Sequence, residues 1–441
     1  MKGIMGKGKT IAAIDIGTEK VCTLIAQIVD GEREPSVVGV ASVPSKGLRK
    51  SQIVDLDEAI EAITQSVDAA ERMAGVGLKS AYISIGGSHV ESQNSKGVVA
   101  VANPQGEINE DDIRRVIEAA RAVSLPSARE VIHVIPKDYK VDSQDGIKDP
   151  LGMSGVRLEC ETHIITGSST AMKNMTKCVN ELGVHPEGFV FGGLASAYAV
   201  LSETEKELGV LLLDIGAGTT SICVFVEGSL AHSAVLPIGA RHITNDIALG
   251  LRMSLQSAEK IKIALSTGQH LEIPVLPGET RDQARERKKK EDEVDTSRLG
   301  LTEDVGPVSR KTVFEGIIMP RLQEMFKLVG QELDKHGLLP LVPAGAVLTG
   351  GGAETIGMVD VCKRTLGLPT RVGRPQGLRG LTDEVLASPY ATSAGLLLYG
   401  AQLYALHNAG SKESHVLDMF KHLPLKPLVE RLVKLVKSVM P

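Results

Sequence analysis

Short apolar runs that end in an acidic residue and a glycine occur twice in this chain, about 200 residues apart. The first is Thr10–Val21 (TIAAIDIGTEKV), and the second lies within Gly209–Gly228 (GVLLLDIGAGTTSICVFVEG). Each pattern predicts a buried strand, a tight turn and a returning strand. A third apolar run, Val347–Ala353, ends in Thr–Gly–Gly–Gly before a helix-like pattern. The repeat predicts two related lobes.

Between these runs, the apolar spacing predicts helices and a separate insert. We expect six segments to be helices: 57–75, 171–182, 192–201, 243–251, 257–264 and 314–336. Pro320 suggests that the last of them starts there, and residues 391–406 close the folded body. Residues 81–85 read as a short strand. The stretch that follows, about 75 residues long, is large enough for a small α+β subdomain. We expect Thr162–Thr166 to rejoin the first sheet after it.

Composition and charge restrict the function more than the fold. A net charge of −5 and an aromatic content of 3% disfavour nucleic acid as a partner, because a basic surface and stacking side chains are both scarce. The 5 cysteines are scattered without a C-x-x-C pair, which predicts a reduced, cytoplasmic protein and no zinc site. No run resembles a signal peptide or a membrane span. We therefore expect a protein that stays inside the cell.

The second glycine turn has the composition of a phosphate-binding hairpin. Gly216 and Gly218 allow the backbone to approach a ligand closely, and the N–H groups of Thr219–Thr220 can hold phosphate oxygens. Asp214 at the end of the strand can hold Mg²⁺ through water. Taken alone, the pattern also fits a glycine hairpin without any ligand. The repetition of the pattern is what favours a binding site.

Two Asp–Gly–Thr hairpins followed by a Thr–Gly–Gly–Gly turn resemble the actin-like ATPase superfamily, in which the hairpins clamp the phosphates of ATP and the last turn lies against the adenosine. The resemblance implies a site of hairpin and glycine-turn residues: Asp15, Gly17, Thr18, Lys20, Asp214, Gly216, Gly218, Thr219, Thr220, Gly350, Gly351, Gly352 and Ala353. It also implies Mg²⁺ held through water by Asp15 and Asp214. Glu259 and Lys262 match the position that closes over the nucleoside, although an exposed ion pair is an equal alternative.

Three phrases narrow the resemblance to the FtsA family of bacterial cell-division proteins: His133–Asp142 (HVIPKDYKVD), Gly146–Leu158 (GIKDPLGMSGVRL) and Phe191–Leu201 (FGGLASAYAVL). The implied fold is α/β: an actin-like two-lobed fold of duplicated ribonuclease-H-like domains with an FtsA-type insert and a C-terminal amphipathic helix. The implied ranges are subdomain IA at 10–84 and 163–207, insert IC at 85–162, IIA at 208–243 and 303–406, IIB at 244–302, a linker at 407–424 and the terminal helix at 425–441.

The same resemblance implies how the protein acts. In actin and MreB a Gln or Glu opens the helix that connects the lobes, whereas this chain has Gly192 there, so we expect ATP binding with weak or negligible hydrolysis. The implied partners are the C-terminal tail of the tubulin-like FtsZ on IIB, later divisome proteins on IC, and further copies of the chain in a filament. Arg310 is a candidate contact for the acidic FtsZ tail.

The C-terminal stretch predicts a membrane-binding helix. Apolar residues recur at helical spacing between cations: Leu428, Val429, Arg431, Leu432, Lys434, Leu435, Val436, Lys437 and Val439. Such a stripe suits the interface of an anionic bilayer, here the cytoplasmic face of the inner membrane at the division septum. The alternative is a helix packed on its own protein. A single helix binds a membrane modestly, so stable attachment needs the several copies that a filament supplies.

Several other interpretations of the sequence stay open. An actin-fold small-molecule kinase or phosphatase, or a pilus-assembly adaptor, would share the superfold. The charged segment 278–304 carries a basic run at 285–290 that suits docking, but acids flank it on both sides, which is more typical of a solvated surface. His133, His163, His232 and His242 are most simply structural.

Overall fold

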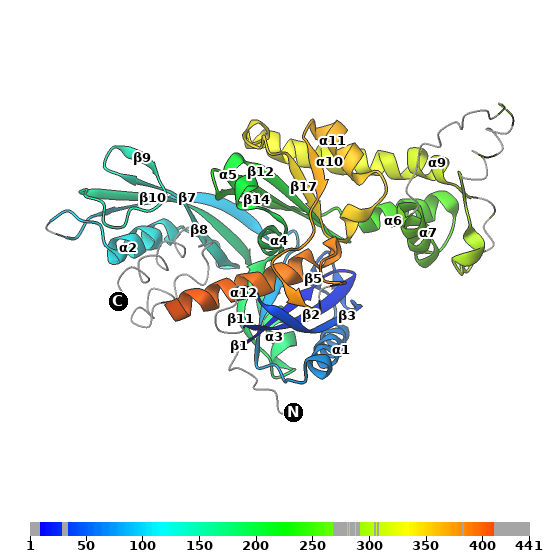
Figure 1. The fold of residues 1–441 in the computed structure, drawn as a ribbon, viewed down its shortest axis with the longest axis horizontal. Helices are drawn as coiled ribbons and strands as arrows, with labels where there is room; N and C mark the ends of the chain where they lie inside the picture. The colour runs from blue at the N-terminus through cyan, green and yellow to red at the C-terminus, as the bar shows by residue number, and fades with distance from the viewer. Residues whose placement is uncertain are drawn as a thin grey trace.

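A computed structural model describes residues 9–409 of the chain, outside gaps at 29–33, 104, 268–279, 281, 283–286, 288–291, 304–305, 307 and 382. Two lobes, each built on its own sheet, lie against each other, and two smaller units project in opposite directions (Figure 1). This is the α/β arrangement that the repeated hairpins predict. Among the described residues, no helix has the length and apolarity needed to cross a bilayer.

The first lobe holds a six-stranded sheet in the order β11-β6-β1-β2-β3-β19. Its strands and helices are β1 (Lys9–Ile16), β2 (Lys20–Ile28), β3 (Ser36–Pro44), β6 (Ser80–Ile85), β11 (His185–Phe191), β19 (Arg379–Gly380), α1 (Leu56–Ala74) and α3 (Ser169–Asn180). A two-stranded hairpin of β4 (Leu48–Arg49) and β5 (Gln52–Ile53) lies beside it. Helix α1 begins where the Asp55 side chain accepts from Glu58 N–H and ends at left-handed Gly75.

The second lobe holds a five-stranded sheet in the order β14-β13-β12-β17-β18. Its elements are β12 (Val210–Ile215), β13 (Thr220–Val226), β14 (Ser229–Leu236), β17 (Ala346–Thr349), β18 (Thr370–Val372), α10 (Met319–Lys335) and α11 (Met358–Leu366). One projection belongs to this lobe and holds α6 (Ala240–Leu251), α7 (Leu255–Thr267), β15 (Glu293–Val294), β16 (Val308–Ser309) and α9 (Arg310–Val313). Single helical turns occupy Thr296–Arg298, Leu339–Leu341, Gly351–Glu354 and Ser388–Tyr390.

The other projection is the insert, a four-stranded sheet in the order β7-β10-β8-β9 with one helix against it. Its elements are β7 (Glu91–Ala100), α2 (Glu110–Arg121), β8 (Arg129–Val141), β9 (Gln144–Ile147) and β10 (Arg157–Ser168). Asn109 and Asp112 form a capping box that starts α2. Gly97 lies under α2, because a Cβ there would collide with the backbone of Val116 and Ala120.

Two helices join the lobes through a shared core. Helices α4 (Gly192–Val200) and α12 (Ala391–Ala409) pack on each other, and α4 is followed by α5 (Glu203–Leu208). Leu194, Leu396 and Leu397 are almost fully buried there, together with residues from both sheets. Small residues at the contact allow the two helices to approach closely. Gly395 of α12 lies directly against the backbone of Ala195 of α4. The lobes therefore meet on a tightly packed helix pair.

Most of the element predictions are confirmed, and two are wrong in part. Residues 162–166 do not rejoin the first sheet, because β10 continues through them and pairs with β7 and β8 of the insert. The helix expected to start at Pro320 is preceded by further helical turns: α9 leads through a π-helical segment, Phe314–Ile318, directly into α10. Pro320 therefore lies inside a continuous helix, directly after the π-helical segment, where its missing N–H removes one helical hydrogen bond.

Candidate functional site

The two glycine hairpins have the same backbone geometry. Strands β1 and β2 pair antiparallel up to a turn in which Gly17 N–H donates to the Lys20 carbonyl at 3.0 Å. Strands β12 and β13 pair in the same way, and Gly216 N–H donates to the Thr219 carbonyl at 2.9 Å. In each hairpin the aspartate lies two residues before the glycine, at the end of its strand. The sequence repeat is therefore a structural repeat.

The tips of the hairpins face each other across a loop of the first lobe. A Cβ on Gly218 would come within 3.0 Å of Thr18 Oγ1 and 3.2 Å of Lys50 Cα. Ser51 joins the two tips: its N–H donates to Thr18 Oγ1 at 2.9 Å, and its hydroxyl lies 3.4 Å from Thr219 Oγ1. Lys50 and Ser51 both have left-handed backbones, with φ of 49° and 59°. Such strain in non-glycine residues is typical of functional loops.

A cleft of about 860 Å³ opens between the hairpins. Fourteen of the fifteen residues predicted for the nucleotide site line it: Asp15, Gly17, Thr18, Lys20, Asp214, Gly216, Gly218, Thr219, Glu259, Lys262, Gly350, Gly351, Gly352 and Ala353. The exception is Thr220, which is buried in β13 with its hydroxyl donating to the Ile238 carbonyl at 2.8 Å. The fold thus gathers residues that are more than 300 positions apart in sequence.

The aspartate of each hairpin is half-buried and held by hydroxyl groups. Ser84 on β6 donates to Asp15 Oδ1 at 2.7 Å. Ser196 on α4 and Thr392 on α12 donate to Asp214 Oδ2 at 2.7 and 3.0 Å. Sequence reasoning missed these three hydroxyls, because no local pattern marks a residue that reaches the site only through the packing of another element.

Burial raises the pKa of both aspartates. The pKa of Asp15 lies above its ordinary value, mainly because burial disfavours the charged form, although the Ser84 hydrogen bond and Lys20 oppose the shift. Burial likewise raises the pKa of Asp214 to about 6; the negative charge of Asp15 adds to that rise. Two neighbouring carboxylates in one cleft are a favourable environment for a divalent cation, which would neutralise both.

Lys20 supplies positive charge to the same part of the cleft. Its ammonium group lies 3.5 Å from the centre of the Tyr390 ring, a close cation–π contact. Its charge also lowers the pKa of Asp15 and of Asp214, which places it within electrostatic reach of both carboxylates. A cation at this point can balance the charge of phosphate oxygens that enter between the hairpins.

The Thr–Gly–Gly–Gly turn requires its glycines. Strand β17 runs parallel to β12, so the turn that follows β17 comes beside Asp214. Gly350 has φ of 82°, and its N–H donates to the Ser388 carbonyl at 3.1 Å. A Cβ on Gly350 would collide with Asp214 Oδ1, and one on Gly352 would collide with Ile215. The turn therefore forms one wall of the cleft at the foot of the second hairpin.

Glu259 and Lys262 form a partly buried network, which disagrees with the alternative of a simple exposed ion pair. Lys262 Nζ lies 2.8 Å from Glu259 Oε2 and donates to Thr244 Oγ1 at 2.9 Å. Thr244 in turn donates to Glu259 at 2.5 Å. Only 9% of the Lys262 side chain is exposed, against 39% of Glu259. The network links α7 to α6, and both Glu259 and Lys262 line the cleft.

Gly192 is the first residue of α4 and also lines the cleft. A Cβ there would meet Thr392 Cγ2 at 3.6 Å and the Ile85 carbonyl at 3.8 Å, which are ordinary contacts. The position therefore has room for a side chain, although this chain carries none. No polar group enters the cleft from it.

The remaining predicted residues lie away from the cleft or outside the described part of the chain. Arg310 is the half-buried first residue of α9 and is not among the residues that line the cleft. The linker at 407–424 falls outside the described residues from 410 onward, as does the whole helix at 425–441 with its apolar and basic positions. Most of the basic run at 285–290 also lies outside them.

Three of the four histidines expected to be structural have structural partners. His133 accepts from Phe191 N–H at 3.0 Å through Nε2. His163 lies between Asn94 Oδ1, at 2.7 Å, and Ser233 Oγ, at 2.9 Å. His242 Nδ1 lies 3.1 Å from Gly239 N at the start of α6. The fourth, His232, belongs to a different cluster.

Comparison with known families gives two matches that together cover the insert and the second lobe. Residues 87–166 match the model of the SHS2 domain inserted in FtsA, and residues 211–395 match the model of cell division protein FtsA. The first match corresponds to β7–β10 with α2, and the second includes the hairpin of β12 and β13 and the glycine turn after β17.

Solved structures of other actin-like proteins share the fold at low sequence identity. The PilM-PilN type IV pilus biogenesis complex is similar with a TM-score of 0.61 and 17% identity, covering 89% of this chain and 98% of that chain. MreB5 of Spiroplasma citri bound to AMPPNP is similar with a TM-score of 0.52 and 12% identity, covering 91% and 98%. These likenesses show a common actin-like fold.

Curated relatives are much closer in sequence. Cell division protein FtsA of Pseudomonas aeruginosa is 39% identical over 436 residues, covering 98% of both chains. FtsA of Borreliella burgdorferi is 37% identical over 395 residues, covering 88% of this chain and 90% of the relative. The insert, the paired hairpins and the glycine turn thus occur in a chain that matches these relatives over nearly its whole length. This protein belongs to the FtsA family of cell division proteins.

Proposed function

We propose that this protein binds ATP with Mg²⁺ between its two hairpins and, as a membrane-bound filament, tethers the FtsZ ring to the cytoplasmic face of the inner membrane at the division septum. The observation that carries the nucleotide part is the convergence of two equivalent Asp–Ile–Gly hairpins and a glycine turn on one cleft. The nucleotide named for the MreB structure of the same fold supports this choice.

The residues of the cleft fit a magnesium nucleotide. The tips of the two hairpins come so close at Gly218 and Thr18 that position 218 has no room for a side chain. Asp15 and Asp214 would hold Mg²⁺ through water, and the ion would supply charge neutralisation for the phosphates. Lys20 would contact phosphate oxygens, while Glu259 and Lys262 would cover the nucleoside from α7.

Hydrolysis is expected to be weak, because nothing at Gly192 orients an attacking water. The space around this position makes the expectation testable: Gly192→Gln should fold, since its Cβ meets only ordinary contacts. If the missing polar group limits turnover, this variant should hydrolyse ATP faster than the wild type, measured as phosphate release. An unchanged rate in a variant that still binds ATP would contradict this explanation for slow hydrolysis.

Nucleotide binding itself is tested by equilibrium dialysis of ATP against the full chain, with and without Mg²⁺. Saturable binding of one ATP per chain that strengthens with Mg²⁺ is expected. Asp15→Ala and Asp214→Ala should each weaken the Mg²⁺-dependent part, whereas Asp68→Ala, at an exposed residue of α1 that does not line the cleft, should not. Binding that is absent from the wild type, or that is equal in all four proteins, would contradict the assignment.

The membrane part rests on the apolar and basic stripe of residues 425–441. We expect the full chain to co-sediment with anionic vesicles and to form filaments on them in Mg-ATP. A version ending at Ser411 should stay in the supernatant, because it lacks the stripe. Neutral vesicles should retain less protein, since the cations contribute about 1 kcal/mol each at an anionic surface. Binding that is independent of residues 412–441 would contradict the tether.

The partner surfaces are assigned from the family and from charge. The FtsZ C-terminal tail would dock on the projection that contains α6, α7 and α9, with Arg310 contacting its acidic residues. Later divisome proteins would meet the insert. Arg310→Ala should weaken binding of an FtsZ tail peptide, whereas Lys363→Ala, an exposed cation on α11, should not. Equal affinity of the two variants would contradict the role of Arg310.

A further inference from the structure

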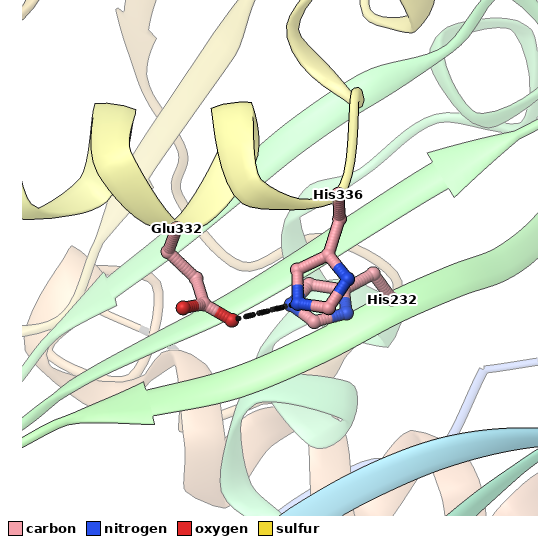
Figure 2. A group of neighbouring side chains, drawn as sticks. All are labelled: His232, Glu332 and His336. Atoms are coloured by element: carbon pink, nitrogen blue, oxygen red, sulfur yellow. Dashed lines mark hydrogen bonds and ion pairs between the residues drawn. The ribbon is translucent and has the colours of Figure 1, made fainter.

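Three side chains with metal-binding atoms converge at the edge of the second lobe. His232 lies on β14, the edge strand of the five-stranded sheet, while Glu332 lies in the last turn of α10 and His336 directly after it. Glu332 and His336 are four residues apart, so the helix presents them on one face. Figure 2 shows all three side chains directed toward a common point between the strand and the helix.

Glu332 lies at short and similar distances from both histidines. Glu332 Oε1 lies 3.1 Å from His232 Nε2 and 3.4 Å from His336 Nε2. The centres of the two imidazole rings lie 4.3 Å apart, and the ring planes make an angle of 34°. In the part of the chain that the structure describes, this is the one group of three such residues whose ligand atoms all lie within 4.8 Å of one another.

These separations agree with the geometry of a tetrahedral metal site. Zinc bonds to imidazole nitrogen and carboxylate oxygen are about 2.0–2.1 Å long, which places neighbouring ligand atoms about 3.4 Å apart. Two histidines and one glutamate form a donor set that zinc accepts with its fourth position open to water. We propose that His232, Glu332 and His336 form a binding site for a divalent transition metal of the zinc type.

The exposure of the ligands suits the entry of an ion. The side chain of His232 is 12% exposed and that of Glu332 is 20% exposed, whereas His336 is 40% exposed. Solvent therefore reaches the site from the His336 side, where a water molecule would complete the coordination. The lack of a C-x-x-C pair in the sequence argued against a zinc site built from cysteines. The present site uses no cysteine; it joins His232 to Glu332, which lie 100 positions apart in the sequence.

The position of the site gives the metal a structural consequence. Residue 233, next to His232, is the point where β14 meets the insert: Ser92 Oγ donates to the Ser233 carbonyl at 2.6 Å, and His163 Nε2 lies 2.9 Å from Ser233 Oγ. A bound ion would fix this segment of β14 to the end of α10. We therefore expect metal binding to stabilise the edge of the second lobe on which the insert rests.

The alternative is that no ion binds between these three side chains. Glu332 would then simply accept hydrogen bonds from both imidazoles, at the same distances. Metal titration separates the two cases, because a hydrogen-bonded cluster does not select Co²⁺ or Zn²⁺ and gives no ligand-field spectrum.

The test uses the untagged full chain, freed of metal with a chelator and kept without nucleotide. Co²⁺ titration should give the intense visible absorption of four-coordinate cobalt with one ion per chain, and Zn²⁺ should abolish it by displacement. His336→Ala and Glu332→Gln should lower the affinity at least about tenfold. His185→Ala, another exposed histidine, should leave it unchanged.

Two outcomes would overturn the proposal. One is the absence of a four-coordinate cobalt spectrum in the wild type. The other is equal affinity of the His336→Ala and His185→Ala variants, which would place the bound metal elsewhere. Because His336 is exposed and ends its helix, its replacement is expected to leave the fold intact, and circular dichroism spectra of the variants check this. The result is independent of ATP binding in the cleft.

Discussion

The two phosphate-type hairpins have one backbone geometry but different surroundings. The aspartate of the first hairpin is held by Ser84, which comes from a strand of the same sheet. The aspartate of the second is held by Ser196 and Thr392, which come from the two helices packed between the lobes. Duplication therefore explains why the two turns share one backbone geometry, whereas the elements packed around each hairpin determine which hydroxyl groups hold its aspartate.

The hairpins also bring different groups to the cleft. The first supplies a cation, Lys20, and a hydroxyl, Thr18; the second supplies a glycine, Gly218, where the two tips come closest. The first hairpin therefore contributes positive charge, whereas the second contributes a backbone that approaches the first closely. The second aspartate, which is linked to both connecting helices, is also the better placed to transmit the state of the cleft to the packing between the lobes.

The largest effect is expected from a side chain placed between the tips. Gly218→Val adds carbon atoms where a Cβ already lies 3.0 Å from Thr18 Oγ1, so the hairpins must move apart. We expect ATP affinity to fall at least about 100-fold, or about 2.7 kcal/mol. Gly316→Val, at a glycine with open space around its Cβ, serves as the control. Calorimetric titration with ATP measures both, and equal affinities would contradict the close approach.

The second aspartate should produce a distinctive pH dependence. Because folding raises the pKa of Asp214 from 3.8 to about 6, the stability that this group contributes is fully present below about pH 4 and is lost as the pH rises through 6. Asp214→Asn should therefore be more stable than the wild type at pH 7.5 by about 1–3 kcal/mol. Denaturant unfolding at pH 4.5 and 7.5 measures this difference.

The same variant separates stability from binding. Mg²⁺ needs the ionised carboxylate, so the Mg-ATP affinity of the wild type should rise as the pH increases through about 6. In Asp214→Asn that rise should be much smaller, and the affinity at pH 7.5 should be at least about tenfold lower, or about 1.4 kcal/mol. A variant that is less stable at neutral pH, with an unchanged pH profile, would contradict the assigned role of burial.

Lys20 tests the charge that the first hairpin contributes. Lys20→Met keeps the length of the side chain but removes the cation near both aspartates and the Tyr390 ring. ATP affinity should fall about tenfold, or about 1.4 kcal/mol, and the pKa of Asp214 should rise further. Lys46→Met, an exposed lysine that pairs weakly with Glu61, should have no effect on either quantity.

The smallest expected effect belongs to Ser51, which joins the two tips. Ser51→Ala removes the hydroxyl that lies 3.4 Å from Thr219 Oγ1 but keeps the N–H bond to Thr18. Because a neutral hydrogen bond contributes about 1 kcal/mol, we expect about a fivefold loss of ATP affinity. Ser80→Ala provides a control on β6 of the same lobe. A larger loss than that of Lys20→Met would mean that the joining of the tips matters more than charge.

Sequence reasoning identified the cleft because its signals are local. A glycine turn after a buried strand, repeated twice with an aspartate at the same place, is visible in a dozen letters. Twelve of the predicted residues that line the cleft belong to the two hairpins and the glycine turn after β17. The same reasoning missed Ser51, Ser84, Ser196 and Thr392, since each is an ordinary serine or threonine until packing brings it to an aspartate or a hairpin tip.

Membership in the FtsA family disfavours the alternative functions that the sequence left open, namely a kinase, a phosphatase or a pilus adaptor.

The errors have a similar cause. Residues 162–166 read as a strand of the first sheet because a strand carries no mark of its partner, and only pairing with β7 and β8 showed that it belongs to the insert. Glu259 and Lys262 fitted an exposed ion pair equally well until Thr244 and the burial of Lys262 were known.

The sequence by itself determined the two hairpins, the glycine turn, most of the helices and the family, because strand and helix periodicity and turn chemistry are properties of neighbouring residues. Tertiary structure alone decided which hydroxyls hold each aspartate, how far burial raises their pKa, and that His232 meets Glu332 and His336. These features depend on distances between residues far apart in the chain, and on the exclusion of water, which exist only once the lobes have packed together.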